Sequence, residues 1–184
     1  RCAPAGSPLT LAPQQALSEE FLARPDRQLA EVKAVRDERA PGAPIWLTET
    51  GGAACGGLAW QTDFLDVFRY LDTHARLARQ GLDAIFTHAL ISGNNGVIDE
   101  KTLEPNASYW AAVLWRRLMG HRVLDAGSPQ PGLHVYAHCL RGVSGGVAVL
   151  ALNLRDNPAS LDLASDRTEL YRLTASQLQG RQVA

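Results

Sequence analysis

Apolar residues recur at helical spacing in three stretches of the chain. The three predicted helices span residues 25–39, 63–81 and 107–119. In the second, Asp63 can cap the first turn and Gly81 can end the helix. Each predicted helix has one apolar face that we expect to be buried, formed by Leu29, Val32 and Val35, by Phe64, Val67, Phe68 and Leu71, and by Trp110, Val113, Leu114 and Leu118.

Shorter apolar runs lie between these helices and predict β-strands. A buried strand is expected over residues 45–48, ending at Glu49, and a second strand over residues 83–90. The resulting order of helix, strand, loop and helix is typical of parallel α/β folds. Beyond Gly120 the pattern changes to consecutive strand-like runs, which predict an antiparallel β-sandwich. Those runs are residues 133–139, 146–154, 160–163 and 168–173.

The change of pattern near Gly120 predicts a boundary between two domains, residues 1–120 and 121–184. Two parallel strands cannot close a barrel, and four short strands make a thin sandwich. We therefore expect a fragment or one chain of a cleaved protein, which a second chain or a missing segment would complete.

Composition narrows the classes of partner. With 18 Lys and Arg against 19 Asp and Glu, the net charge is -1. The chain therefore lacks the basic excess by which nucleic-acid-binding proteins release counterions. No apolar run approaches the roughly 20 residues of a membrane-spanning helix, and no signal-peptide pattern opens the chain. The three cysteines, Cys2, Cys55 and Cys139, form no CxxC pair and no complete disulfide framework.

The strongest chemical signal is the segment Trp46-Leu47-Thr48-Glu49-Thr50-Gly51-Gly52. In parallel α/β folds the active site is built at the carboxyl ends of strands and in the loops that follow them. Glu49 stands at such an end, and the glycines after it let main-chain N–H groups approach an anionic ligand. The alternative is that Glu49 only forms an ion pair with an arginine of a neighbouring strand. The local pattern favours neither interpretation.

Three longer stretches carry a wider resemblance. They lie around residues 45–57, 63–81 and 102–120 and read WLTETGGAACGG, TDFLDVFRYLDTHARLARQGLD and LEPNASYWAAVLWRRLMG. Two later runs, LHVYAHC and GGVAVLALNL, extend the similarity, which spans roughly residues 18–155. Together these stretches resemble glycoside hydrolase family 79, the heparanase and β-glucuronidase family, and the later runs are similar to its C-terminal β-sandwich.

The resemblance implies a fold and a reaction. The fold is the C-terminal part of a (β/α)8 TIM barrel, with residues 1–120 as its last βα units, followed by part of an antiparallel β-sandwich. The reaction is that of a retaining glycosidase in which Glu49 is the nucleophile and forms a glycosyl-enzyme ester. The acid/base carboxyl group, ~5–5.5 Å from the nucleophile, would lie on sequence upstream of Arg1. Two carboxyl groups suffice for this chemistry, so we expect no metal and no organic cofactor.

The resemblance also implies substrate-binding residues. Members of the family bind the carboxylate of glucuronic acid partly through backbone N–H groups in the glycine loop, which here are near Cys55, Gly56 and Gly57. A glutamine of the family corresponds here to His88, and a tyrosine corresponds to Asn95, so this chain offers different groups to a substrate. His88 can hydrogen-bond a sugar or the nucleophile, or it can be an ordinary packed histidine.

Two functions remain open from the sequence. The first is part of a heparanase-like glycosidase that cuts β-glucuronide bonds in a glycosaminoglycan such as heparan sulfate, in a secreted or periplasmic setting. The second is a non-catalytic carbohydrate- or partner-binding fragment in which Glu49 is structural. Trp60 can stack on a sugar ring or pack in the core. His134 and His138 share one strand face without a third ligand type, so we predict no zinc site.

Overall fold

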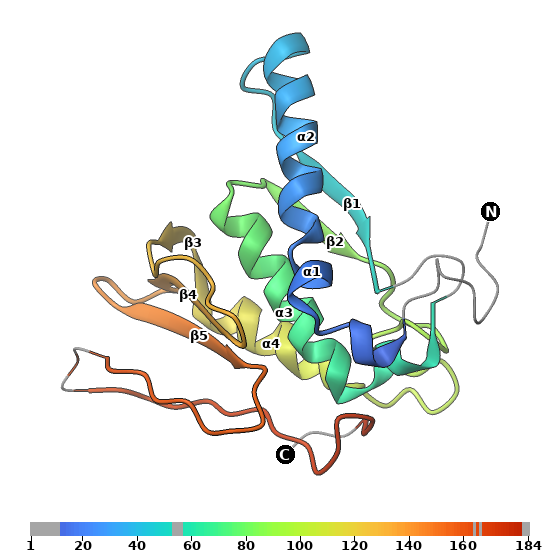
Figure 1. The fold of residues 1–184 in the computed structure, drawn as a ribbon. Coiled ribbons are helices and arrows are strands. Elements are labelled where there is room, and N and C mark those ends of the chain that lie inside the picture. The colour runs from blue at the N-terminus through green and yellow to red at the C-terminus, as the bar shows by residue number, and fades with distance from the viewer. Residues whose placement is uncertain (1–11, 53–56, 164, 166, 182–184) are drawn as a thin grey trace.

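The structure is a computed structural model that describes residues 12–52, 57–163, 165 and 167–181. It has a mixed helix and strand fold with two small sheets (Figure 1). The elements in chain order are η1 (Pro13–Gln15), α1 (Glu19–Leu22), α2 (Arg24–Arg39), β1 (Trp46–Thr50), η2 (Ala59–Thr62), α3 (Phe64–Arg79), β2 (Ala84–Thr87), α4 (Ala107–Leu118), β3 (Met119–Leu124), β4 (Leu133–Leu140) and β5 (Val147–Asn153). The three predicted helices are present. No helix among the described residues combines the length and the apolar character that crossing a bilayer requires.

The strands β1 and β2 form a parallel pair, as the alternation of elements predicts. Leu47 lies opposite Ile85 and Thr50 opposite Thr87, with an irregularity of register between Leu47 and Thr50. α3 lies between these strands in the chain, so the three elements make one βαβ unit. Because the strands are parallel, the loops after Thr50 and Thr87 leave the sheet at the same end.

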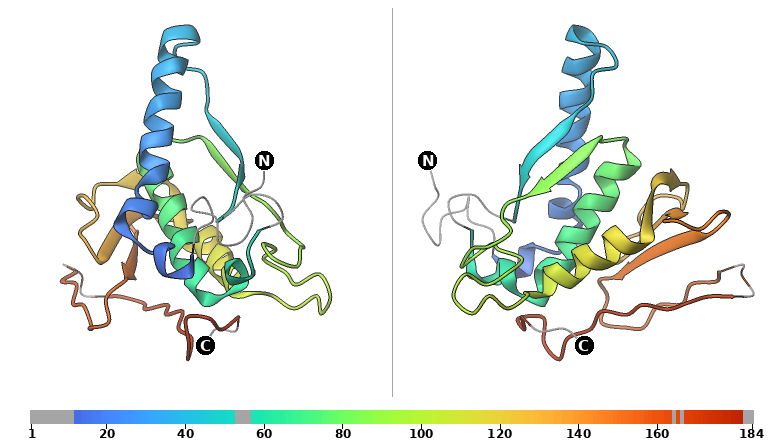
Figure 2. Two further views of the ribbon diagram at one scale, coloured as in Figure 1. Left: turned by 45° about the vertical axis from the view of Figure 1, so that its right-hand side comes forward. Right: turned by 180° about the vertical axis from the view of Figure 1, so that it is seen from behind.

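Two apolar segments are less buried than their patterns predict. Residues 45–48 were expected to form a buried strand, yet Trp46 of β1 is 60% exposed. In α2 only Leu29 is buried, and Val35 of the same predicted face is 62% exposed. These residues are exposed because the helices lie on only one side of the β1–β2 pair and because α2 projects from the body (Figure 2).

The second sheet is antiparallel, in the order β3-β4-β5. β4 and β5 pair in continuous register, from Leu133 opposite Asn153 to Cys139 opposite Val147. The sequence did not predict β3, because Gly120 and the exposed polar residues His121 and Arg122 interrupt its apolar pattern.

The strands predicted over residues 160–163 and 168–173 are wrong. Both segments are extended chain without strand structure and run alongside β5 (Figure 1). Their apolar residues have no hydrogen-bonded strand partner among the described residues, and Leu170 is 76% exposed. Leu173 packs against the main core. The described part of the β-rich region is therefore one sheet of three strands.

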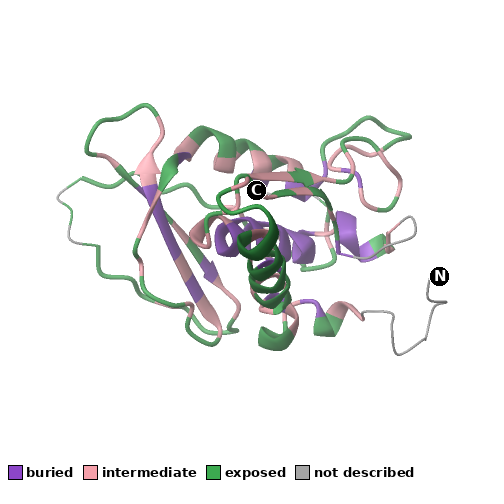
Figure 3. Cartoon of the chain, turned by 90° about the horizontal axis from the view of Figure 1, so that it is seen from above, coloured by how far each residue is buried: buried purple, intermediate pink, exposed green. Residues whose placement is uncertain are grey.

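The main core is built around α3, and Figure 3 shows the buried residues gathered at the centre and on the neighbouring sheet. This core joins α3, α4, β4 and β5 through Phe64, Val67, Tyr70, Leu71, Ala75, Ala107, Ala111, Tyr136 and Leu152. The secondary structure changes from helix to sheet at Met119. The helical and the β-rich parts nevertheless share this core, and the division into two domains near Gly120 stays a prediction.

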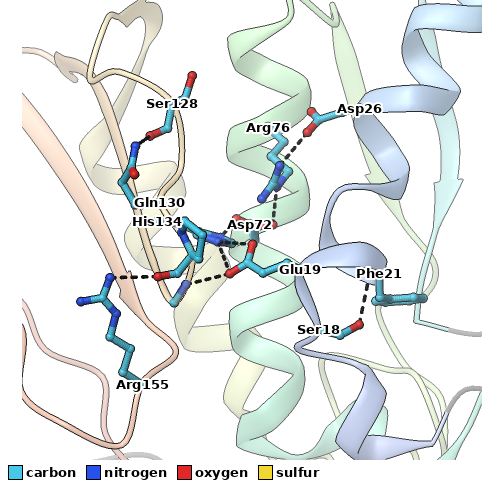
Figure 4. Close-up of polar contacts among 12 residues, drawn as sticks. Ser18, Glu19, Phe21, Asp26, Asp72, Arg76, Ser128, Gln130, His134 and Arg155 are labelled. Carbon is cyan, nitrogen blue, oxygen red and sulfur yellow. Dashed lines mark hydrogen bonds and ion pairs between the residues drawn. The ribbon is translucent and has the colours of Figure 1, made fainter.

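A buried polar cluster crosses the same core (Figure 4). Asp72 of α3 is fully buried, and Nε of Arg76, one turn further on, donates to it at 2.6 Å. From β4, the Tyr136 hydroxyl donates to the same carboxylate at 2.5 Å, and Nδ1 of His134 lies 2.6 Å from it. Nε2 of His134 lies 3.0 Å from Glu19 of α1. We call these five residues the Asp72 cluster.

The Asp72 cluster also reaches α2. Nη1 of Arg76 donates to Asp26 at 2.6 Å, and the amide of Gln80 donates to the other oxygen of Asp26. Burying a charge is costly unless it is paired and hydrogen-bonded. The cluster satisfies this condition only when α1, α2 and β4 all lie in their places against α3.

The charges around His134 decide its protonation. Burial by itself lowers the pKa of His134. The hydrogen bond to Asp72 and the negative charges of Asp72 and Glu19 outweigh burial and the charge of Arg76, so the pKa is raised. The protonated ring can donate from both nitrogens, one toward each carboxylate. Burial and the charge of Asp72 raise the pKa of Tyr136, which remains a neutral donor.

The first turn of α3 is capped by a distant segment. Asp63 occupies the N-cap position, as predicted, but its side chain makes no capping hydrogen bond. The N–H groups of Phe64 and Leu65 donate instead to the carbonyls of Gly180 and Leu178, at 2.6 and 2.8 Å. These contacts satisfy donors that the start of a helix leaves without intrahelical partners.

The free energy of unfolding should fall as the pH rises through the range in which His134 loses its proton. A base with a raised folded pKa contributes stability that is fully present below its unfolded value of 6.5 and is lost above the folded value. Urea unfolding over a pH series should show this decline, and His134→Gln should remove it. His138→Gln is the matched control, because His138 is buried on the same face but bonds the Gly120 carbonyl. A wild-type curve without the decline would contradict a protonated cluster.

Asp72→Asn should destabilise the protein by about 3–5 kcal/mol, because Arg76 and His134 lose their one fully buried anion and keep only the more exposed Asp26 and Glu19. Asp37→Asn is the control, since Asp37 is 62% exposed and pairs with Arg36 on the surface. That change should cost about 0–1 kcal/mol. Equal losses of unfolding free energy in the two variants would show that the cluster does not hold the elements together.

Candidate active site

Glu49 lies in β1, one residue before its carboxyl end, and is exposed. This end of β1 is tied to the end of β2, because the N–H of His88 donates to the carbonyl of Thr50 at 3.0 Å. The first residue after β2 is therefore fixed beside the residue that follows Glu49. This is the end of the sheet at which the sequence predicts the site.

A cavity of about 560 Å³ opens at this place, and Glu49, His88 and Asn95 line it together. Gly51 contributes to the same wall, while residues of α2 and α3 supply much of the apolar lining. The structure thus brings together three of the predicted site residues, one from β1 and two from the loop after β2.

Hydrogen bonds within the loop after β2 hold His88 and Asn95 in a fixed relation. Nδ2 of Asn95 donates to the His88 carbonyl at 3.3 Å, and the N–H of Ala89 donates to the Asn95 carbonyl at 3.3 Å. The peptide bond between His88 and Ala89 is cis. His88 is exposed and Asn95 is half-buried, so the imidazole is accessible while Asn95 braces the loop.

Gly57 lies against the same loop. Its φ is +76°, and a Cβ at this position would lie 2.9 Å from Cβ of Asn95 and 3.2 Å from the Asn94 carbonyl oxygen. Glycine fits here because it has no side chain and adopts a positive φ freely. The predicted site residues Cys55 and Gly56 lie outside the described residues.

The surroundings of Glu49 bear on its two interpretations. Within residues 12–52, 57–163, 165 and 167–181, no arginine forms an ion pair with Glu49. The pairing that would make this residue structural is therefore not seen in that part of the chain. Glu49 is also the one carboxylate among the described residues that line the cavity.

Asp99, in the loop between β2 and α4, stabilises a turn. Its Oδ1 accepts hydrogen bonds from the N–H groups of Lys101 and Thr102 at 2.9 and 3.0 Å. Its Oδ2 accepts one from Arg181 at 3.2 Å. The hydrogen bonds from Thr102 and Lys101 lower the pKa of Asp99. This geometry agrees with a structural role.

Trp60 belongs to a core and does not form a sugar platform. Its side chain is 7% exposed and packs with Ala16 and Leu65. The indole face is therefore not available to a sugar ring, and the stacking alternative is wrong.

The two histidines of β4 also serve the interior. His134 belongs to the Asp72 cluster, and Nδ1 of His138 lies 2.8 Å from the Gly120 carbonyl. The part of the chain that the structure describes contains no group of three His, Cys, Asp or Glu residues placed to hold a metal ion.

Sequence reasoning missed three polar residues behind the site. Asp66 and Arg69 form an ion pair within α3, with Nε 2.5 Å from Oδ1, and both side chains are buried. The charge of Asp66 outweighs burial and raises the pKa of Arg69. With Gln61, this pair lines a small cavity of about 10 Å³ that His88 and Asn95 also line. The sequence contains one indication that this pair is buried, because apolar residues flank both Asp66 and Arg69.

Gly57→Ala should destabilise the protein more than Gly81→Ala. Gly81 has nearly the same φ, +77°, but nothing lies within 4 Å of a Cβ there. Its substitution therefore carries only the cost of a left-handed backbone, about 1–2 kcal/mol. Gly57→Ala adds collisions with Asn95 and Gln61, which should cost roughly another 1–3 kcal/mol. Urea unfolding of both variants measures the difference, and equal losses would show that Gly57 has room for a side chain.

Comparison with known proteins adds the context for this site. A scan against models of protein families finds no match. Heparanase-like protein 1 of Arabidopsis thaliana is 36% identical over 142 residues, which are 75% of this chain and 26% of that protein. Heparanase of Gallus gallus is 30% identical over 156 residues, 80% of this chain and 30% of that protein. Baicalin-beta-D-glucuronidase of Scutellaria baicalensis is 32% identical over 151 residues, 77% of this chain and 28% of that protein.

The chain spans between a quarter and a third of the length of these relatives. Inactive heparanase-2 of Homo sapiens is also similar, at 30% identity over 156 residues, 74% of this chain and 26% of that protein. Similarity in this region therefore does not by itself separate active from inactive members. The identities of 30–36%, over three quarters of the chain or more, agree with the resemblance of its motifs. The chain belongs to the family of heparanases, heparanase-like proteins and related β-glucuronidases, glycoside hydrolase family 79.

Proposed function

We propose that this chain is part of a retaining glycoside hydrolase that cleaves β-glucuronide bonds, with Glu49 as the nucleophile. The observation that carries the proposal is the position of Glu49, an accessible carboxylate near the end of a parallel strand that shares a cavity with His88 and Asn95. Relatives named heparanase and baicalin-beta-D-glucuronidase support glucuronides as the substrate class.

The reaction would proceed in two displacements. The carboxylate of Glu49 attacks the anomeric carbon, the bond to the leaving oxygen breaks, and a glycosyl ester forms. A second carboxyl group gives its proton to the leaving oxygen and then takes one from the water that hydrolyses the ester. We place this acid/base group on sequence upstream of this chain, which spans only part of the length of its relatives. In a retaining enzyme the two groups lie ~5–5.5 Å apart.

The substrate would be held by the two loops that border Glu49. We infer that backbone N–H groups near Cys55, Gly56 and Gly57 bind the glucuronate carboxylate. The contact of Gly57 with Asn95 supports a single binding surface made by both loops. His88 offers its imidazole to a sugar hydroxyl, and a glycosaminoglycan such as heparan sulfate is the proposed polymer.

The proposed architecture follows from the same family. Residues 1–120 would be the last βα units of a (β/α)8 barrel, and residues 121–184 part of a β-sandwich, completed by a second chain or a missing segment. The parallel pair joined through α3 supports the first assignment, and the antiparallel sheet supports the second. Because glycosaminoglycans are extracellular polymers, we propose a secreted or periplasmic location.

Glu49→Gln should abolish turnover of a β-glucuronide by the complete polypeptide that carries this chain. Loss of the nucleophile should lower kcat by roughly 10³-fold or more, as in other enzymes with covalent intermediates. Glu104→Gln is the control, because Glu104 is an exposed carboxylate that does not line the cavity, and it should keep full activity. A 2-fluoro-β-glucuronide that forms a slowly hydrolysed ester should add its mass to the peptide containing Glu49.

The outcomes separate the two functions. Turnover that survives in Glu49→Gln would make the nucleophile assignment wrong. A wild-type protein that binds the glucuronide without cleaving it, and binds equally well after the substitution, would establish the non-catalytic alternative.

A further inference from the structure

We propose that Asn106 is a positioning residue for the candidate site. Its side-chain amide and its main-chain N–H hold the loop after β2 in the shape that presents His88 and Asn95 to the cavity. The inference rests on the proposed function, because it concerns the cavity that we expect to receive the glucuronide.

Asn106 is the N-cap residue of α4 and is 3% exposed. The side-chain oxygen of an N-cap asparagine usually accepts a hydrogen bond from an N–H group of the first helical turn. Within α4, all of which the structure describes, Asn106 makes no such bond. Its Nδ2 donates instead to the Gly96 carbonyl at 2.9 Å, and this hydrogen bond is buried. The side chain therefore holds the loop before the helix and does not cap the helix itself.

A second hydrogen bond joins the same residue to the next carbonyl of the loop. The main-chain N–H of Asn106 donates to the Val97 carbonyl at 2.8 Å. One hydrogen bond would allow the loop to rotate about it, whereas two bonds to successive carbonyls restrict both its position and its orientation. Asn106 thus fixes the peptide segment of residues 96–97.

This segment is bonded to both cavity residues. Asn95 directly precedes Gly96. The N–H of Val97 donates to the Ala89 carbonyl at 3.1 Å, and the N–H of Ala89 donates to the Asn95 carbonyl at 3.3 Å. His88 directly precedes Ala89, and its carbonyl accepts a hydrogen bond from Nδ2 of Asn95 at 3.3 Å. A displacement of residues 96–97 would therefore move both His88 and Asn95, which line the cavity.

Asn106 can hold the loop because the start of α4 is anchored. Ala107, the next residue, and Ala111, one turn further on, are both fully buried in the main core. A residue that positions a site is effective when it stands on a rigid element. The position of the loop is thereby fixed relative to the main core.

Two substitutions of Asn106 remove the amide donor and keep a favoured N-cap residue. Asn106→Asp keeps the size of the side chain, but an ionised carboxylate cannot donate to the Gly96 carbonyl. Asn106→Ser removes the amide without adding a charge. Asn94→Asp is the matched control, because it makes the same chemical change in the same loop, at an exposed residue that lines neither of the two described cavities.

The pH separates loss of the donor from other effects of Asn106→Asp. Burial raises the pKa of a carboxyl group introduced at position 106, so a moderate fall in pH protonates this group. The protonated carboxyl group can again donate a hydrogen bond to the Gly96 carbonyl. The defect of this variant should therefore be reversed by acid, whereas the defect of Asn106→Ser should not.

In the complete polypeptide, Asn106→Asp should raise KM for a β-glucuronide about tenfold near neutral pH, the effect of losing one hydrogen bond. The change in kcat should be smaller, because Glu49 lies on β1, outside this loop. The ratio of the KM of Asn106→Asp to that of the wild type should fall toward one at about pH 5. Asn106→Ser should show the increase at both pH values, and Asn94→Asp at neither.

Hydrogen–deuterium exchange measured by mass spectrometry tests the loop directly. Exchange in peptides of residues 88–97 should become faster in both Asn106 variants at neutral pH and remain at the wild-type rate in Asn94→Asp. Exchange in β4 should not change, because β4 is held by its own strand pairs. Faster exchange in β4 as well would reflect a general loss of stability and would overturn the positioning role.

The exchange measurement also keeps this proposal apart from the proposed function. If the wild-type protein does not cleave β-glucuronides, the proposed function fails, and exchange alone decides whether Asn106 holds the loop. Unchanged exchange in residues 88–97 overturns the proposal, and so does faster exchange with an unchanged KM in an active enzyme. An equal rise of KM in Asn94→Asp overturns it too, because the added charge would then explain the effect. If Asn106→Asp does not fold, the KM and the exchange of Asn106→Ser decide in its place.

Discussion

A carboxylate in a protein interior is tolerated only where donors and positive charges surround it. Asp72 meets this condition with Arg76 from its own helix and with His134 and Tyr136 from β4. Arg76 and His134 are held in turn by acidic residues of α2 and α1. Burial of apolar surface has no directional preference, whereas hydrogen bonds join specific atoms. The Asp72 cluster therefore fixes the position of α3 against β4 atom by atom.

The elements that could be predicted are those whose pattern is local. The apolar face of α3 and the continuous runs of β4 and β5 are visible in a few consecutive residues. What could not be predicted depends on distant partners. Residues 160–163 alternate like a strand but have no strand beside them among the described residues, and Met119 begins a strand because β4 lies next to it. In the sequence, Asp72 looks like an exposed helix residue, because the β4 residues that surround it are more than 60 positions away.

The residues of the candidate site also divide into those that could be predicted from the sequence and those that could not. Active sites of parallel α/β folds form at the carboxyl ends of strands, and this rule identifies Glu49. The resemblance to a family identifies His88 and Asn95, and all three residues line one cavity. Their roles in chemistry stay predictions. Asn106 could not be found from the sequence, because its surroundings arise only when the chain turns and brings two carbonyls of the loop to it. Contacts between the two ends of a loop produce no periodic pattern in the sequence from which they could be predicted.

The capping of α3 by Gly180 and Leu178 has a consequence for synthesis on the ribosome. The chain emerges from its N-terminus, so α3 is outside the exit tunnel well before the segment that supplies these two carbonyls. Until then water must solvate the first turn of α3. Asp72 likewise lacks its hydrogen-bond partners His134 and Tyr136 until β4 has been made. The helix at the centre of the structure therefore gains its last N-terminal hydrogen-bond partners only after most of this chain has been made.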